Sequence, residues 1–252
     1  MSVSHKFSMS IPQLNFLLDK IHDLIAIDEE VLLKVDKKNL LLYVIVGEQS
    51  NVNAFKSFIF KTEEVFLFDT PLESEMRFII TNGGKFESSL KNFIDYNEEL
   101  TCEFFMSDDT YSDNLKLKNS KFNLSVTGGH PQGVNVSIDI EKIKKTMNKD
   151  NIDFQFILDK NSYAKIKKQA TIETENDILT LNIENKLLSI GEGYWDIKIC
   201  EVEHEDLSIT FPKKYFKSIT FTEEQINVYV FPTFLLVDNK NTNLLIALEL
   251  TV

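Results

Sequence analysis

The feature of this sequence that most constrains its fold is an internal repeat. Residues 7–11 alternate apolar and polar side chains and lead directly into a helical pattern, and residues 154–158 do the same. A hairpin pattern follows each of them, at residues 31–45 and 178–190, so the two passages correspond at an offset of 147–148 residues. A pattern that recurs in one register predicts two similar domains built in the same way.

A second passage repeats at a shorter offset. Residues 86–104 and residues 212–230 both read as a short helix, an acidic turn and a strand, separated by 126 residues, so that Leu100 corresponds to Ile226 and Cys102 to Val228. The drop in offset predicts that the first half carries roughly 21 additional residues, which we place in the loops of residues 47–75.

Strand patterns dominate both halves, and each half adds two short helices. We therefore expect an α+β fold of two similar domains, each made of antiparallel sheets with two short helices. A turn-rich stretch of glycine and proline at residues 127–133 marks a connector between the halves. The expected organisation is a first domain at 1–127, a connector with a short basic helix at 128–150, and a second domain at 151–252.

Composition predicts a cytoplasmic globular protein. Of the 252 residues, 43% are hydrophobic, which is ordinary for a packed domain, and no apolar run is long enough for a membrane helix. The start of the chain lacks the basic and apolar pattern of a secretory signal. Cys102 and Cys200 lie in strand-like runs, so we expect buried thiols in a reducing compartment, the host cytoplasm if the protein is phage-encoded.

The charge is segregated along the chain. The net charge is −12, but residues 142–149, 160–168 and 212–220 hold eleven lysines and no acid, which leaves −23 for the rest. A solvated surface usually mixes both signs. Two interpretations remain open: lysines that only aid solubility, or a cationic surface that faces phosphates while acid covers the exterior.

No catalytic motif is present. The four histidines are isolated from one another and from the cysteines, so the spacing of a metal site is missing, and an ion at His204 is less favoured than a solvated acidic loop. The glycine turn at residues 81–89 differs from a phosphate-binding loop because Ile79 and Phe86 occupy its required glycine and hydroxyl positions. We expect no catalytic residue, no metal and no other cofactor, and therefore not an enzyme.

Two apolar features near the end of the chain allow two interpretations. Residues 231–237 place Pro232 among aromatic residues, and residues 244–252 are strongly apolar. They predict either a buried final strand or one wall of a groove for a partner peptide.

Two tandem domains, each with two strand–helix–strand units and with lysines on the short helices, resemble the sliding-clamp family of DNA polymerase processivity factors. The resemblance covers the whole chain and rests on architecture, with residues 154–191 and 207–230 as its closest passages. It is to the two-domain type, meaning proliferating cell nuclear antigen and the clamps of tailed phages, and it favours a phage or viral source. The alternative is a structural or virion-assembly protein of duplicated β-rich domains without a DNA function.

The resemblance implies a homotrimeric ring that encircles double-stranded DNA without regard to sequence and tethers the replicative DNA polymerase. Its partners would be DNA, the polymerase, a clamp loader and further copies of itself, and no membrane. The helices at about 12–25, 85–95, 160–170 and 212–220 would line the hole, although acids offset the lysines of the first two. The DNA-facing residues would be Lys20, Lys91, Lys165, Lys167, Lys168, Lys213, Lys214 and Lys217. The partner-peptide groove would use Val44, Val46, Gly128, Pro131, Val134, Pro232, Phe234, Leu250 and Val252.

Overall fold

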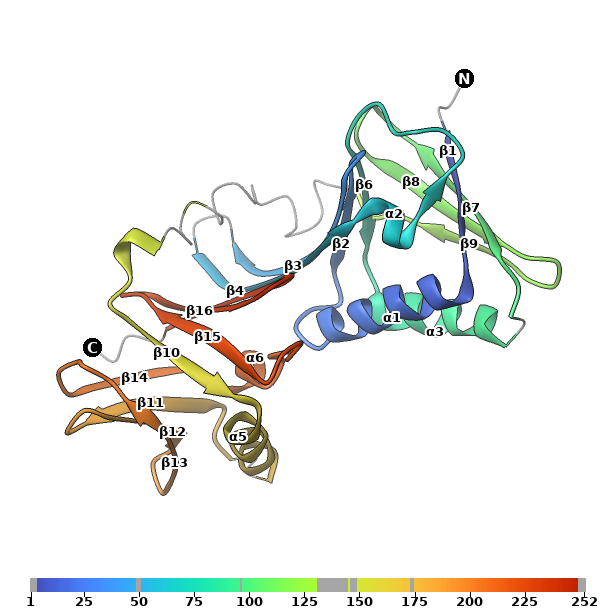
Figure 1. Cartoon of the computed structure of the whole chain (residues 1–252). Helices are drawn as coiled ribbons and strands as arrows, with labels where there is room; N and C mark the ends of the chain where they lie inside the picture. Colours follow the sequence, from blue (N-terminus) through green and yellow to red (C-terminus); the bar gives the residue numbers. More distant parts are fainter. Residues whose placement is uncertain are drawn as a thin grey trace. The chain divides into compact units, whose positions relative to one another are not determined.

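The computed structural model describes residues 4–48, 51–95, 97–130, 145, 149–172 and 175–248 (Figure 1). The chain divides into two compact units. Unit 1 comprises residues 1–49 and 56–138, and unit 2 comprises residues 50–55 and 139–252. The expected domain limits at residues 127 and 151 stay a prediction, because most of the connector lies outside the described residues.

Unit 1 is built from short antiparallel strands and two longer helices. Its elements are β1 (Ser4–Met9), α1 (Ile11–Ile25), β2 (Val31–Val35), β3 (Asn39–Glu48), the second half of β4 (Asn51–Lys61), α2 (Thr62–Val65), β5 (Leu67–Phe68), β6 (Met76–Ile80), α3 (Gly83–Ile94), β7 (Leu100–Met106), β8 (Ser112–Lys118) and β9 (Asn123–Thr127). Residues 51–55 of β4 belong to unit 2. One sheet has the order β5-β1-β7-β8-β9, and β4, β3, β2 and β6 are successive neighbours in another. Helices α1 and α3 pack against each other.

Unit 2 follows the same plan. Its elements are β10 (Phe154–Asp159), α5 (Lys160–Ile172), β11 (Ile178–Glu184), β12 (Leu187–Glu192), β13 (Trp195–Glu201), β14 (Leu207–Pro212), α6 (Lys213–Phe216), β15 (Gln225–Val230), β16 (Phe234–Asn239) and β17 (Thr242–Ala247), with a 3₁₀ turn at Lys149–Asn151. Strands β10, β15, β16 and β17 are neighbours in one sheet, and β13-β12-β11-β14 form the other.

The predicted fold class and the repeat are both confirmed. The order β1-β7-β8-β9 in unit 1 corresponds to β10-β15-β16-β17 in unit 2, and β4-β3-β2-β6 corresponds to β13-β12-β11-β14. The first strand of each unit pairs antiparallel in the same way, with β7 beside β1 and β15 beside β10. Each half of the chain therefore folds as one copy of the same α+β unit.

The offset expected for the first strand was wrong by two residues. Phe7 pairs with Cys102 in unit 1, and in unit 2 the residue that pairs with Val228, the counterpart of Cys102, is Phe156 and not Phe154. A strand repeats its side-chain direction every two residues, so a shift of two leaves the apolar face unchanged and the sequence cannot show it. The corresponding offset is 149 residues, the difference between positions 7 and 156.

We expected the additional residues of the first half to lie in loops, but some of them form regular structure. Strand β4 corresponds to β13, but the single turn α2 and the short strand β5, which pairs with β1, have no counterpart among the described residues of unit 2. Phe66 packs against Phe7, with ring centroids 4.7 Å apart, and is buried. The insertion therefore adds to the core of unit 1.

Helix starts follow the sequence closely. The backbone N–H of Ser10 donates to Oε1 of Gln13 at 2.8 Å ahead of α1. In unit 2, Oδ1 of Asp159 accepts hydrogen bonds from the backbone N–H groups of Asn161 and Ser162, at 3.0 and 2.9 Å. These bonds satisfy amides that a helix leaves free at its first turn. They hold the pKa of Asp159 below its ordinary value, with the bonds from Ser162 as the main cause.

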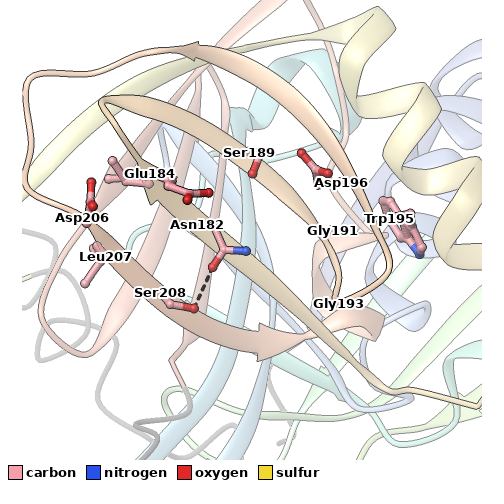
Figure 2. A pocket seen from close by; sticks show the side chains of 11 residues that line it. Asn182, Glu184, Ser189, Gly191, Gly193, Trp195, Asp196, Asp206, Leu207 and Ser208 are labelled. Carbon is pink, nitrogen blue, oxygen red and sulfur yellow. Dashed lines mark hydrogen bonds between the residues drawn. The ribbon is translucent and has the colours of Figure 1, made fainter.

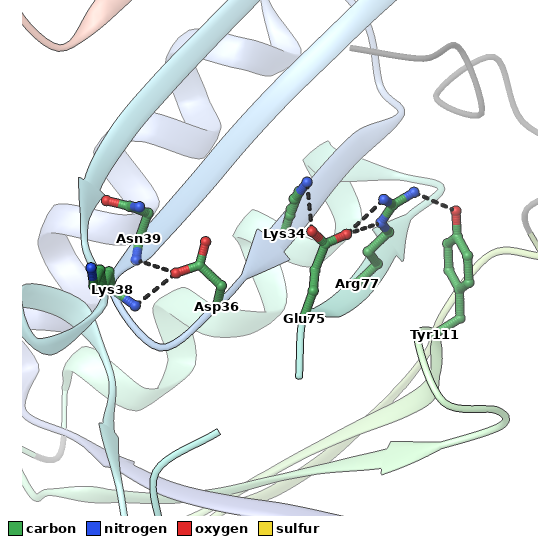
Figure 3. Close-up of polar contacts among 7 residues, drawn as sticks. All are labelled: Lys34, Asp36, Lys38, Asn39, Glu75, Arg77 and Tyr111. Atoms are coloured by element: carbon green, nitrogen blue, oxygen red, sulfur yellow. Dashed lines mark hydrogen bonds and ion pairs between the residues drawn. The ribbon is translucent and has the colours of Figure 1, made fainter. Parts of the chain in front are cut away.

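A polar network fastens the β6 edge of unit 1 (Figure 3). Glu75 lies between Lys34 and Arg77, with contacts of 2.6 Å to each, and Arg77 also contacts the hydroxyl of Tyr111 at 3.3 Å. The backbone N–H of Arg77 donates to Thr110 at 2.7 Å. Burial alone would raise the pKa of Glu75, but the two cations outweigh it and hold that pKa low. The network joins β6 to the turn between β7 and β8.

Candidate nucleic-acid interface

The lysines of α5 project away from the core of unit 2. The buried face of this helix consists of Tyr163, Ile166 and Ala170. Lys165, Lys167 and Lys168 lie between these positions and are exposed. Because apolar residues at helical spacing fix which side faces the sheet, the lysines occupy the solvent side.

Helix α6 is a single turn that carries two further accessible lysines. Lys214 is exposed, and Lys217, at the carboxyl end of the turn, is half-buried. The ring of Phe216 packs against Tyr163 of α5 with centroids 5.8 Å apart, so the two helices are neighbours. None of the lysines Lys165, Lys167, Lys168, Lys214 and Lys217 forms an ion pair with an acid in the described part of the chain.

Lys213 does not belong to this surface, so its expected contact with DNA was wrong. Its side chain is 5% exposed, and its ammonium lies 2.9 Å from a carboxylate oxygen of Glu192, which is 1% exposed. Glu192 comes from β12 and reaches α6 from the sheet. A buried charge is stable only when it is paired, so Lys213 is held inside the unit.

In unit 1, the lysines on the helices pair with acids of the same helix. The ammonium of Lys20 on α1 lies 2.6 Å from Asp19 and within 5.5 Å of the Phe16 and Phe58 rings. On α3, Lys91 lies 2.6 Å from Glu87, one turn earlier. Both lysines are where the sequence placed them, on the helices, but their charge is largely balanced by acids.

Glu87 is the centre of a small charged cluster between α1 and α3. It is almost fully buried and also contacts Nδ1 of His22, at 3.2 Å. Burial would raise the pKa of Glu87, but its bonds with Lys91 and His22 prevail and hold that pKa below its usual value. Glu87 is therefore a carboxylate at neutral pH and reduces the positive potential of this helix pair.

Acidic residues gather on one face of the β13-β12-β11-β14 sheet of unit 2, the face that points away from the core. A hollow of about 590 Å³ lies on this sheet (Figure 2). Asn182 and Ser189, which line it, alternate with the buried residues Leu181 and Leu188, so the hollow lies on the face away from the core. Its lining contains Glu184, Asp196 and Asp206 and no lysine. Unit 2 thus carries lysine on its helices and mostly acid on the outer face of the sheet, where Lys198, opposite Ser189, is also exposed.

A second hollow, of about 560 Å³, includes two of the predicted groove residues. Pro232, in the turn between β15 and β16, and Phe234, the first residue of β16, line it together with Phe231 and Ile152. The rings of Phe231 and Phe234 stack 4.2 Å apart. Sequence reasoning missed Ile152, although an apolar residue just before β10 is a signal that could have found it. The hollow has an apolar floor and an open mouth that suit the side chains of a peptide.

The other predicted groove residues have different environments. Val44 is fully buried in β3, which is covered on both faces, so its expected contact with a partner was wrong; Val46 is half-buried. Gly128 is packed so closely that an added Cβ would lie 2.8 Å from the Ser112 carbonyl oxygen and 2.9 Å from the Phe78 ring. Four predicted residues lie outside the described residues: Pro131, Val134, Leu250 and Val252.

The described residues offer little for chemistry. They contain no group of three metal-binding side chains, and none of their helices is long and apolar enough to cross a membrane. Burial raises the pKa of Cys102 and of Cys200, which keeps both thiols protonated and unreactive. Of residues 142–149, whose helix was expected, only Lys145 and Lys149 are described.

The fold has clear counterparts among solved structures. DNA polymerase III subunit beta of Borrelia burgdorferi matches 97% of this chain over 64% of its own length, with a TM-score of 0.66 and 14% identity. The same subunit of Pseudomonas aeruginosa matches 98% of this chain over 66% of its own length, with a TM-score of 0.68 and 14% identity. The Helicobacter pylori beta clamp bound to a DNA ligase peptide matches 96% over 65%, with a TM-score of 0.61 and 15% identity.

No protein-family model and no curated protein sequence matches the chain. The chain spans about two thirds of the length of the beta subunits it resembles. Their likeness extends over nearly all of this chain, so the chain has the fold of the DNA polymerase III beta sliding clamps.

Proposed function

We propose that this protein is a sliding clamp, which encircles duplex DNA and tethers a replicative DNA polymerase to it. The observation that carries the proposal is the cationic surface of unit 2, formed by Lys165, Lys167, Lys168, Lys214 and Lys217, in a fold shared with beta clamps. The acid on the far face of the sheet supports it, because acid repels DNA from the outside of a ring.

The lysine surface suits contacts that hold DNA loosely. A lysine ammonium is a point charge on a flexible stem, and it pairs with phosphates without the fixed geometry of arginine. Such contacts are independent of sequence and weaken with salt. A ring that binds in this way stays on DNA because it surrounds it and can still move along it.

We infer a head-to-tail homotrimer, which brings six similar units into one ring. Strands β9 and β13 each end a sheet of the chain, and an edge strand has backbone groups that can pair with another copy. Their surroundings have opposite charge. The hairpin of β8 and β9 exposes three lysines and one acid, Lys116, Lys118, Lys121 and Asp113. Strand β13 and the next turn expose more acid than lysine, with Asp196, Glu201 and Glu203 beside Lys198. An interface between different surfaces of identical copies closes into a ring when the rotation from one copy to the next returns to the first copy.

We further propose that the hollow at Ile152, Phe231, Pro232 and Phe234 receives an apolar segment of the polymerase and of the clamp loader. An open apolar hollow with two stacked rings is able to bury such side chains. The H. pylori clamp among the similar structures binds a DNA ligase peptide, which supports a peptide ligand here.

Two measurements test the proposed function. Light scattering in solution is expected to give a mass near three times 29.1 kDa, and a strict monomer at high concentration would contradict the ring. In the second, the polymerase and loader encoded in the same genome copy primed circular single-stranded DNA with and without this protein. We expect longer products in its presence; products of unchanged length would point instead to a structural protein.

A further inference from the structure

Lys217 lies at the end of a helix that is too short to be stable on its own. Helix α6 has a single turn, Lys213–Phe216, and Lys217 caps its carboxyl end. One turn of helix is unstable in isolation because its few hydrogen bonds do not offset the cost of ordering the backbone. The surroundings of α6 must therefore fix where its lysines lie.

Tyr163 of α5 provides such a contact at the end of α6. Its hydroxyl donates a hydrogen bond to the carbonyl oxygen of Lys217 at 2.8 Å and lies 3.3 Å from that of Phe216. Carbonyl groups at the end of a helix have no partner within the helix, so the hydroxyl supplies one. The ring of Tyr163 is buried and packs against Phe216 and Phe221, with centroids 5.8 and 5.0 Å away.

The same side chain also contacts the lysine row of α5. The ammonium of Lys167 lies 5.7 Å from the centroid of the Tyr163 ring, within the range of a cation–π interaction. Tyr163 thus contacts Lys167 by its ring and the backbone of Lys217 by its hydroxyl. It connects two cationic groups that come from different helices.

The start of α6 has separate anchors. Lys213 pairs with Glu192, and the backbone N–H of Lys213 donates to the Asp177 carbonyl at 2.8 Å. The end that carries Lys217 also has backbone bonds, from Lys217 to Lys213 at 3.0 Å and from Ile219 to Phe216 at 3.1 Å. Loss of the Tyr163 hydroxyl would leave all of these bonds in place and loosen only the end that carries Lys217. The hydroxyl can therefore be tested without removing the whole helix.

We propose that Tyr163 is a positioning residue for DNA binding: its hydroxyl fixes α6 against α5, so that the lysines of both helices meet the phosphates as one surface. This inference rests on the proposed function. Tyr163 is buried and does not touch DNA itself. It affects DNA binding through the position of Lys217.

The test is Tyr163→Phe in the full-length protein, which deletes the hydroxyl and keeps the ring. The probe is a fluorescein-labelled 30-base-pair duplex of random sequence, titrated at several NaCl concentrations by fluorescence anisotropy. One hydrogen bond of this kind is worth up to about a tenfold change in an equilibrium constant, so we expect about three- to tenfold weaker binding. The slope of log affinity against log salt should become shallower by about 0.9, the value of one lost phosphate contact.

Lys217→Gln supplies the decisive comparison. If the hydroxyl acts through Lys217, Tyr163→Phe has no further effect on affinity or on the salt slope in the Lys217→Gln background. Tyr194→Phe is the matched control, because Tyr194 is an exposed tyrosine of the same unit in the turn between β12 and β13. It should leave both quantities unchanged.

The outcomes separate this inference from the proposed function. Equal effects of Tyr163→Phe with and without Lys217 would overturn the positioning role, as would a lower melting temperature with unchanged affinity and slope. If the wild-type protein does not bind the duplex even at the lowest salt, the lysine surface does not contact phosphates and this inference fails. The proposed function is tested apart from it, by the mass in solution and by the length of the polymerase products.

Discussion

The helix pairs of the two units have the same place in the fold, but their lysines are balanced by acids in unit 1 and mostly unbalanced in unit 2. In unit 1, Lys20 and Lys91 each lie 2.6 Å from an acid on their own helix. In unit 2, Lys160 at the start of α5 lies 3.8 Å from Glu224. The other exposed or half-buried lysines of α5 and the α6 turn have no such partner among the described residues: Lys165, Lys167, Lys168, Lys214 and Lys217. A duplicated fold fixes where helices lie, whereas the charge on their surfaces can change one residue at a time. The cationic surface is therefore concentrated in one copy of the repeat.

A pair of corresponding turns shows the same divergence. Between β7 and β8, Oδ1 of Asp108 accepts hydrogen bonds from the backbone N–H groups of Thr110 and Tyr111, at 2.7 Å each. Between β15 and β16, the turn presents Pro232 and the stacked rings of Phe231 and Phe234. The first turn is closed by its own polar groups, and the second leaves an apolar surface open to a partner.

The largest effect is expected where a lysine is buried. Lys213→Ala leaves the carboxylate of Glu192 buried without its cation, and breaking such a pair costs about 3–5 kcal/mol of unfolding free energy. Lys20→Ala in unit 1 removes a lysine paired with an exposed aspartate and should cost about 1 kcal/mol or less. Denaturant unfolding followed by fluorescence measures both. Equal losses of unfolding free energy in the two variants would contradict the distinction between the buried lysine and the surface lysines.

Charge reversal tests which unit binds DNA. Replacing Lys165, Lys168, Lys214 and Lys217 with Glu should weaken duplex binding by about a hundredfold or more at low salt, because each change exchanges an attraction for a repulsion. Reversal of Lys20, Lys85 and Lys91 in unit 1 should weaken it far less. The measurement is duplex affinity by anisotropy, with circular dichroism to confirm that each variant is folded. A larger loss from unit 1 would invert the comparison.

The turn between β15 and β16 should carry peptide binding. Phe234→Ala removes half of the stacked pair and should weaken a polymerase-derived peptide about tenfold, in the range of an interface anchor residue. Tyr111→Ala changes the corresponding turn of unit 1 and serves as the control, with no effect on the peptide. Isothermal titration with peptides from the termini of the cognate polymerase measures the affinity. A loss of peptide affinity in Tyr111→Ala alone would instead place the peptide-binding groove in unit 1.

The smallest expected effect concerns the pH dependence of unit 1. The pKa of Glu87 is lower in the folded protein than in the unfolded chain, so its carboxylate stabilises the fold above its unfolded pKa. That stability is lost as the pH falls through the folded pKa. Glu87→Gln should therefore lower the melting temperature at pH 7, by the equivalent of about 1 kcal/mol, and the difference from wild type should shrink toward pH 3. A difference that grows on acidification would contradict this account.

The repeat predicted most of the architecture, because apolar alternation and helical spacing are local signals. It could not fix the first strand to better than two residues, since Phe154 and Phe156 present the same face. Nor did it show that residues 51–68 form β4, α2 and β5 in the core. Pairing between distant segments decides both features.

The candidate site was less predictable than the fold. The sequence placed Lys213 with the DNA-facing lysines, but its neighbour Glu192 is 21 residues away in the chain, and only folding brings them together. Val44 was expected in a groove and is buried, because strand periodicity does not show which strands are covered on both faces. The role inferred for Tyr163 depends on a hydroxyl direction that no pattern encodes. Pro232 and Phe234, by contrast, were visible as aromatic and proline residues in a turn.

Ring closure with the helices of unit 2 on the inside is the central claim. Negative-stain electron microscopy of the purified protein tests it directly. The account predicts closed rings of six lobes with an open centre, wide enough for a duplex of about 20 Å. Compact single particles, or open filaments without a central hole, would contradict it.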